Sequence, residues 1–161
     1  MITEVDVATK AVAARIPLPV GAQGIRVSPD GRRLYVGDFH RPLLHVIDCT
    51  ARKLIETVPL RGVPGWPFVS RDGGRVIVTT YDEPADRGFV EILEADDLTQ
   101  RRVVEVPAEP FHALAARDGT HIYVALANGQ IPRINLKTAS LADGGFNAGG
   151  TMPEALVYYD R

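Results

Sequence analysis

An Asp-Gly turn that recurs between two β-rich runs constrains this chain more than any other feature. The runs are Val27–Val36, Val69–Val78 and Ala115–Val124. Their glycines recur at a spacing of 42 and then 46 residues. Glycine accepts the positive φ that a tight turn needs, and aspartate bonds its own backbone, so each run is predicted to be a β-hairpin. Self-similarity at this period is typical of repeat architectures, in which each unit stacks on its neighbours.

A second repeated column completes the unit. Segments of alternating character occur at Leu44–Asp48, Val90–Glu94 and Ile131–Asn135. A turn follows each of them, and then another β-rich run, as in Leu54–Val58 and Arg102–Val106. The predicted unit is strand A, Asp-Gly turn, strand B, loop, strand C, turn and strand D. No segment has a persuasive 3.6-residue period, so an all-β chain of four-stranded antiparallel units with almost no helix is expected.

Two strand-B motifs point to a known family. Leu34-Tyr35-Val36 and Ile122-Tyr123-Val124, with the Ser-Pro-Asp-Gly type turns before them, resemble the YVTN repeats of lactonase-like and quinoprotein-dehydrogenase-like β-propellers. The second unit departs from this pattern with Val76-Ile77-Val78. The resemblance extends over essentially the whole chain. It implies blades around a central channel, with strand A innermost and strand D outermost, but it implies no function because propellers host many.

The repeat divides the single domain 1–161 into three whole blades and two pieces of a split one. Residues 1–20 match strands C and D, and residues 151–161 match strand A. The whole blades span residues 21–62, 63–108 and 109–150. Within the last of these, residues 141–150 contain four glycines and make the weakest match to a strand D.

Three blades are too few to close a ring, because propellers typically need 4–8. Open apolar faces and unpaired strand edges would remain. The chain is therefore expected to be about half of a propeller, completed as a homodimer with six whole and two composite blades. The composite blade would lack a strand B. The alternatives are a fragment of a longer propeller, an open arc, and a half-propeller completed by a different partner chain.

One column of the repeat carries unlike residues. Gly24, Trp66, His112 and Glu154 all stand near the start of a strand A, close to the expected channel mouth. The strand positions expected to pack between blades are more uniform. Variation at one column beside similarity at another predicts a specific site on a generic scaffold. The alternative is that mouth residues simply face water, where any side chain is tolerated.

The loops between strands B and C emerge on the same face as this column. Phe39, Tyr81 and Trp66 are expected to give the mouth apolar walls. Its polar groups are expected to be His40, Asp38, Asp82, His112, Arg26 and Glu154. This composition suits a small-molecule pocket and equally a protein-binding rim.

Two functions compete. The first is a binding module whose mouth loops hold a small molecule or a partner protein. The alternative is a cofactor-free enzyme of the isomerase, cyclase, lyase or lactonase type, with His112 and Glu154 as acid and base groups. The resemblance permits such chemistry, because related propellers include lactonases and lyases. No HExxH, Gly-x-Ser-x-Gly, phosphate-loop or Rossmann motif occurs, so neither a metal nor a cofactor is expected.

Charge and hydropathy limit the kinds of partner and the location that are expected. The net charge is −2, and Lys and Arg are scattered, so no nucleic-acid groove is expected. No apolar run approaches the roughly 18 residues of a membrane span. The first residues carry acids where a signal peptide carries positive charge. With the lone Cys49, these features predict a cytoplasmic protein.

Overall fold

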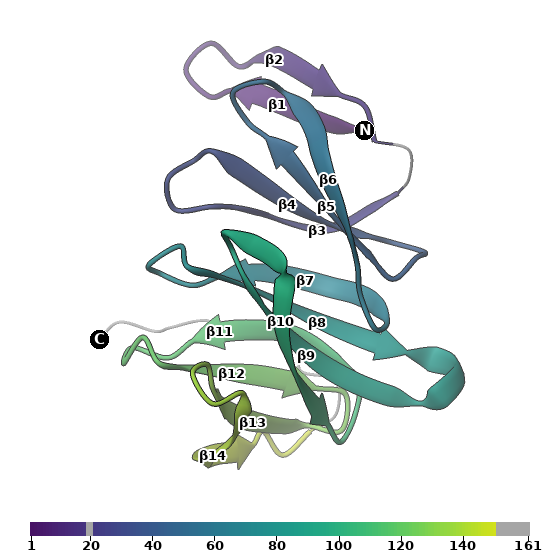
Figure 1. Cartoon of the computed structure of the whole chain (residues 1–161), viewed down its shortest axis with the longest axis vertical. Coiled ribbons are helices and arrows are strands. Elements are labelled where there is room, and N and C mark those ends of the chain that lie inside the picture. The colour runs from purple at the N-terminus through teal and green to yellow at the C-terminus, as the bar shows by residue number, and fades with distance from the viewer. Residues whose placement is uncertain (19–20, 151–161) are drawn as a thin grey trace.

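The chain folds into consecutive β-sheets stacked face to face along its long axis (Figure 1). The computed structural model describes residues 1–18 and 21–150. Three four-stranded antiparallel sheets have their strands in sequence order, and a two-stranded sheet precedes them. The only helix of the described residues is a 3-10 turn, η1 (Glu83–Ala85). None of the described residues forms a helix long and apolar enough to cross a membrane.

Each sheet corresponds to one repeat unit. The partial blade consists of β1 (Ile2–Asp6) and β2 (Ala11–Ile16). Blade 1 consists of β3 (Ala22–Val27), β4 (Arg33–Asp38), β5 (Leu43–Asp48) and β6 (Lys53–Pro59). Blade 2 consists of β7 (Val63–Val69), β8 (Arg75–Asp82), β9 (Arg87–Glu94) and β10 (Asp97–Val106). Blade 3 consists of β11 (Pro110–Ala115), β12 (His121–Leu126), β13 (Gln130–Asn135) and β14 (Ser140–Asn147). The predicted all-β class is confirmed.

The Asp-Gly segments form the turns between strands A and B. In blade 1, Gly31 has φ +73°, and its amide donates to the carbonyl of Ser28 at 2.9 Å. The Asp30 carboxylate accepts from the Arg32 amide at 3.0 Å. Blades 2 and 3 repeat the positive φ at the equivalent glycines. The turn forms because glycine tolerates this conformation and aspartate satisfies the exposed amides.

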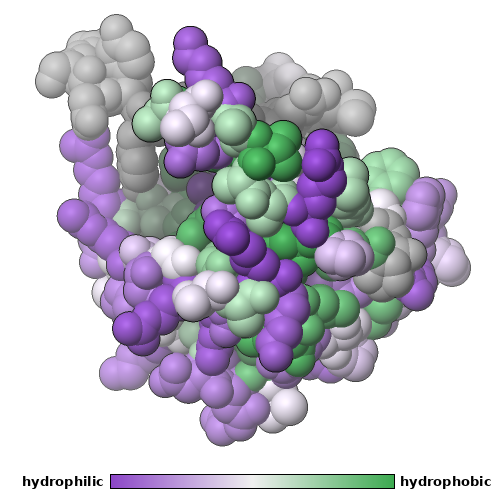
Figure 2. All heavy atoms as spheres, turned by 90° about the horizontal axis from the view of Figure 1, so that it is seen from above, coloured by the Kyte–Doolittle hydropathy of each residue, from purple (hydrophilic) through white to green (hydrophobic). Residues whose placement is uncertain are grey.

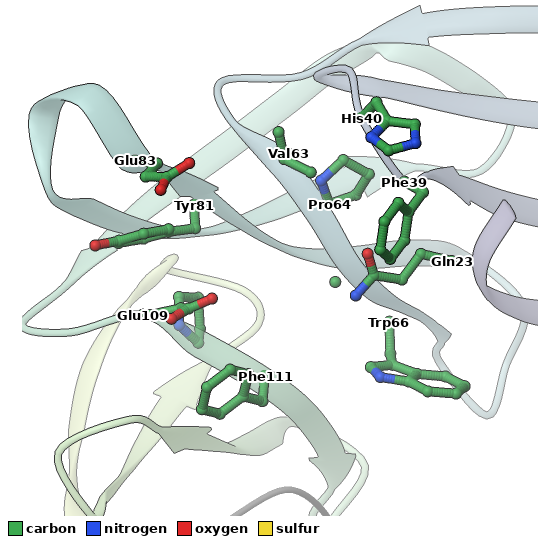
Figure 3. Close-up of a pocket in the computed structure, with 12 residues that line it drawn as sticks. Gln23, Phe39, His40, Val63, Pro64, Trp66, Tyr81, Glu83, Glu109 and Phe111 are labelled. Atoms are coloured by element: carbon green, nitrogen blue, oxygen red, sulfur yellow. The ribbon is translucent and has the colours of Figure 1, made fainter. Parts of the chain in front are cut away.

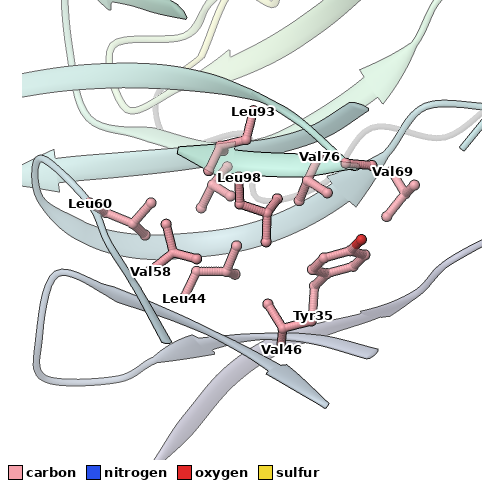
Figure 4. Close-up of a cluster of buried hydrophobic side chains, with 11 residues drawn as sticks. Tyr35, Leu44, Val46, Val58, Leu60, Val69, Val76, Leu93 and Leu98 are labelled. Atoms are coloured by element: carbon pink, nitrogen blue, oxygen red, sulfur yellow. The ribbon is translucent and has the colours of Figure 1, made fainter. Parts of the chain in front are cut away.

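Apolar side chains from adjacent sheets form the core between blades. Strand residues alternate between faces, so Tyr35 and Val46 of blade 1 face Val76 of blade 2 (Figure 4). The full cluster comprises Tyr35, Leu44, Val46, Val58, Leu60, Val69, Val76, Val78, Leu93, Ala95 and Leu98. A second cluster joins blade 2, through residues such as Ile77 and Ile92, to blade 3. Each blade is thus buried against its neighbours, as a propeller requires.

The glycine-rich segment after β13 does form a strand. β14 pairs with β13 through Leu141 opposite Ile134 and Phe146 opposite Ile131, with a bulge between these pairs. The bulge absorbs the irregular glycines that made this the weakest match in the sequence. Pairing with a neighbouring strand therefore decides the structure here, against the local sequence.

The partial blade covers only the outer half of blade 1. Ile2 and Ile16 pack on Leu34, Val36 and Ile47, and the Arg52 guanidinium pairs with the Glu4 carboxylate at 2.9 Å.

On the innermost strand of the same face, Ile25 and Val27 remain 48% and 50% exposed. They are the cross-strand partners of Val36 and Leu34, so they share the face that the partial blade covers further out. Figure 2 views the molecule from the end that carries β1 and β2, and apolar surface is open to solvent there. This strip is where strands A and B of the partial blade would lie in a complete propeller. Residues 154–157, which match strand A in the sequence, lie outside the described residues.

Candidate functional site

Each strand A of the three whole blades contains one extra residue at the same place. In β3, Gly24 falls between the pairs Gln23–Gly37 and Ile25–Val36. In β7, the register shifts between Pro64 and Pro67, around Gly65 and Trp66. In β11, it shifts between Pro110 and Ala113, around Phe111 and His112. These are β-bulges, which bend a strand and redirect its side chains. The three described members of the predicted column, Gly24, Trp66 and His112, therefore lie on a row of bulges.

The bulges of neighbouring blades touch one another. Gly24 has φ +59°, and a Cβ there would lie 2.9 Å from the Cα of Trp66. Between blades 2 and 3, the buried Thr79 hydroxyl donates to the carbonyl of Phe111 at 3.1 Å. The innermost strands are thus held at a fixed spacing, and so are the side chains that the bulges redirect.

A cavity of about 480 Å³ opens beside this row of bulges (Figure 3). We call it the mouth pocket. Its lining comes from all three whole blades: Gln23, Phe39, His40, Val63, Pro64, Gly65, Trp66, Tyr81, Glu83, Glu109, Pro110 and Phe111. The volume falls in the range of small-molecule sites in proteins.

Aromatic side chains form much of its wall. Phe39 and Trp66 are 52% and 47% exposed, which is high for residues of this size. The Phe39 ring meets the His40 ring edge to face, with centroids 4.8 Å apart. Tyr81 and Phe111 complete the aromatic set. Large aromatic surfaces left open around a cavity are available to a ligand.

Two carboxylates share the pocket. Figure 3 shows Glu83 and Glu109 at one end, beside Tyr81, with Phe39 and His40 at the other. Burial raises the pKa of Glu109, and the charge of Glu83 raises it further. Within the described part of the chain, neither side chain makes a hydrogen bond or an ion pair. This end of the pocket therefore brings two carboxyl groups together, and none of the pocket-lining residues is Lys or Arg.

Tyr81 is fixed at the same end. Its hydroxyl donates to the Asp86 carboxylate at 2.6 Å, and this bond is the main reason why its pKa rises to about 12. Asp86 ends η1 in the left-handed conformation, with φ +51°. Tyr81 is thus a neutral phenol, with its ring against the cavity and its hydroxyl bonded to the loop.

A buried carboxylate supports the loop that carries Phe39 and His40. The Asp38 side chain has no exposed surface and accepts from the His40 amide at 3.0 Å and from Arg41 Nε at 2.9 Å. Its second oxygen also lies 3.3 Å from His45 Nε2. Burial acts to raise its pKa, but the hydrogen bonds from these neighbours outweigh that effect and lower it. Asp38 does not line the pocket as predicted, because these bonds hold it beneath the loop.

Glu91 plays a similar supporting role in blade 2. It is completely buried, and its Oε1 accepts from the Arg61 amide at 2.7 Å and from the Thr80 hydroxyl at 3.2 Å. Its Oε2 accepts from Arg101 at 3.1 Å. Arg61 lies in the loop that leads into β7, so Glu91 anchors the approach to Val63 of the pocket. The sequence signal was a charged residue in mid-strand, at the repeat position of His45.

The structure gathers four of the predicted binding residues at the pocket: Phe39, His40, Trp66 and Tyr81. Arg26 does not line it, because its guanidinium lies over the Phe68 ring, 5.9 Å from the centroid. Asp82 is the last residue of β8, opposite Arg87, and also lies outside the lining.

Of the two proposed acid and base groups, the structure describes only His112. His112 is half-buried at its bulge and is not part of the pocket lining. Burial lowers its pKa, and the nearby Arg26 lowers it further. Glu154 lies outside the described residues.

Several lining residues were not expected from the sequence. They are Gln23, Val63, Pro64, Gly65, Glu83, Glu109, Pro110 and Phe111. Glu83 lies in the long loop of the second unit, and Phe111 directly precedes His112. The only indication in the sequence was that some of these residues are neighbours of the predicted column. A one-residue bulge can turn such a neighbour toward the pocket as well. No three His, Cys, Asp or Glu side chains of the described residues gather into a group that could hold a metal ion.

Comparisons with known proteins identify the architecture. No protein-family model matches the sequence, and no curated protein matches it. Hydrazine synthase of Kuenenia stuttgartiensis is similar over 90% of this chain and 43% of its own, with a TM-score of 0.80 and 18% identity. The fold is part of a β-propeller.

Two further propeller structures agree. Dihydro-heme d1 dehydrogenase NirN, in complex with DHE, is similar over 86% of this chain and 30% of its own, with a TM-score of 0.66 and 18% identity. The β-propeller domain of Cps50 (Swd1) from Myceliophteria thermophila is similar over 85% of this chain and 45% of its own, with a TM-score of 0.66 and 14% identity. The chain thus spans less than half the length of each of these structures.

Proposed function

We propose that this chain is a binding module that holds a small organic molecule in the mouth pocket. The observation that carries the proposal is the convergence of open aromatic side chains on one cavity, with Phe39 and Trp66 each about half exposed. Buried carboxylates beneath the adjoining loops support it, because Asp38 and Glu91 preorganise the walls. We also propose that the repeats are of the YVTN type, on their strand-B and turn motifs.

Trp66 is the chain's single tryptophan, so its fluorescence reports on the pocket alone. A fragment screen read by this signal is expected to find small organic ligands. Trp66→Ala is expected to weaken a ligand found in this way at least about tenfold, because buried aromatic contacts dominate such sites. Titration calorimetry measures the loss without the reporter. Phe146→Ala is the control, since Phe146 is a similarly exposed aromatic outside this pocket. Equal affinity in both variants would contradict the proposal.

A cofactor-free enzyme is the second candidate, and one observation favours it. Burial lowers the pKa of His112, which favours the neutral imidazole, the form that can act as a general base, and His112 directly follows the lining residue Phe111. Glu154 would be its partner group. Chemical conversion of a bound ligand that is lost in His112→Ala, while binding persists, distinguishes this function from binding alone.

We further propose that a second copy of the chain covers the open strip of blade 1 in a homodimer. Ile25 and Val27 lie exposed on that strip, and among the strands of residues 1–18 and 21–150 only β2 pairs with β1. Exposed apolar surface beside a free strand edge favours pairing with another chain.

The particle mass in solution tests the homodimer. It is expected to be about twice 17.5 kDa by light scattering. Ile25→Lys is expected to shift the mass toward 17.5 kDa without unfolding the chain, because this side chain is half exposed within one copy. Ile55→Lys on β6 is the control, since Ile55 is similarly exposed but away from the strip. A monomeric unsubstituted chain would refute the dimer.

A further inference from the structure

We propose that the ligand of the mouth pocket is a small organic cation with an ammonium group. This inference rests on the proposed function and names the chemical class that the same cavity would take. The cavity joins aromatic faces with two carboxylates, and this combination distinguishes it from a generic apolar pocket.

The aromatic residues supply the first half of the argument. An aromatic ring carries negative charge on its face and attracts a cation placed within about 6 Å, and Trp is the strongest of the set. Trp66, Tyr81, Phe39 and Phe111 surround the cavity from three blades, as Figure 3 shows. An alkylated ammonium group presents both an apolar surface and a positive charge to such walls.

The carboxylates supply the second half. Glu83 and Glu109 lie at one end of the cavity (Figure 3). Burial raises the pKa of Glu109, and repulsion from the charge of Glu83 raises it further. A cation bound between them would offset both the repulsion between the carboxylates and the cost of burying the Glu109 charge. A neutral or anionic ligand would leave the repulsion in place or add to it.

The protein's own cations do not neutralise this end. None of the twelve lining residues is Lys or Arg. The arginines of the adjoining loops are engaged elsewhere. Arg41 pairs with Asp38 at 2.9 Å and Arg87 with Glu105 at 2.5 Å, and the Arg61 guanidinium lies over the Phe89 ring, 5.6 Å from its centroid. A positive charge supplied from outside therefore has no competitor among these groups.

Matched probes test the charge requirement. Choline and 3,3-dimethylbutan-1-ol have the same shape, but only choline is charged, and benzyltrimethylammonium adds a larger cation. We expect both ammonium probes to change Trp66 fluorescence and choline to bind at least tenfold more tightly than its neutral isostere. Equal binding of the isostere would overturn the cation inference and leave the proposed function standing. If neither ammonium probe binds, the inference also fails, whereas the proposed function is judged by the fragment screen.

Charge-removing variants locate the effect. Glu83→Gln and Glu109→Gln keep the side-chain shape, and each is expected to reduce the preference for choline over its isostere at least threefold. The double variant is expected to abolish the preference. Glu56→Gln is the matched control, because Glu56 is an exposed glutamate on β6 outside the lining, and it is expected to leave the preference unchanged. An unchanged preference in the double variant would overturn the assignment of these carboxylates.

Discussion

Replacing Glu91 with alanine is expected to lower the free energy of unfolding by about 3 kcal/mol. The substitution leaves the Arg61 amide, the Thr80 hydroxyl and the Arg101 guanidinium without their shared acceptor. Removing one partner of a buried charged network is costly because the other members stay buried and unsatisfied. The effect is at the lower end of the range for buried pairs, since the Arg101 side chain keeps 34% of its surface exposed.

Glu94→Ala provides the matched control for Glu91→Ala. The Glu94 carboxylate forms ion pairs with two arginines, Arg75 at 3.6 Å and Arg102 at 2.7 Å, but its side chain is 37% exposed. Exposed ion pairs contribute about 0–1 kcal/mol, so this variant is expected to lose less than 1 kcal/mol. Urea unfolding monitored by circular dichroism measures both variants. Similar losses of unfolding free energy in the two variants would show that burial of the Glu91 hydrogen bonds adds nothing to stability.

Replacing Gly24 with alanine is expected to cost about 3 kcal/mol and to disturb the mouth pocket. Part of the cost is the left-handed backbone, at φ +59°, which alanine adopts poorly. The remainder comes from the new Cβ, which would lie 2.9 Å from the Cα of Trp66 and 3.0 Å from Cδ of Pro67. These are backbone and ring atoms, so strand β7 itself must move.

Gly31→Ala separates the two contributions of Gly24→Ala. Gly31 has a similar φ of +73°, but a Cβ there meets nothing within 4 Å. Gly31→Ala is expected to lower the free energy of unfolding by only about 1 kcal/mol, which is the cost of the left-handed backbone conformation alone. Thermal unfolding gives both stabilities, and the Trp66 emission maximum is expected to shift in Gly24→Ala only. Equal losses in the two variants would mean that β7 accommodates the methyl group freely.

The blades could be predicted from the sequence because their determinants are local. The turn at Asp30 and Gly31 requires only those residues and their immediate neighbours, and it repeats. Strand β14 lacks such determinants, since Gly144 and Gly145 disfavour a strand, and its structure depends on pairing with β13. The open strip at Ile25 and Val27 follows from the phasing of the repeat, which the sequence did reveal.

The site could be predicted only in part, because the sequence shows a residue's type and not its surroundings. Phe39 and Asp38 are adjacent on the same loop, yet one lines the pocket and the other is buried beneath it. Strand alternation does not predict a bulge, so the sequence indicated His112 and not the adjacent Phe111 as a site residue. Glu109 precedes β11 in the loop from blade 2, and only the stacking of blades brings it to Glu83.

The mouth pocket has a consequence for how the chain unfolds. In a stacked array, each blade contacts only its immediate neighbours, so the ends can open without the rest. The pocket departs from that rule, since Phe39 belongs to blade 1 and Glu109 adjoins blade 3, with blade 2 between them. A molecule seated there would contact the first and the third whole blade at once. Opening either of these blades would lose its binding free energy, so the three whole blades of the occupied chain would exchange their amide protons as one cooperative unit, where the empty chain frays blade by blade.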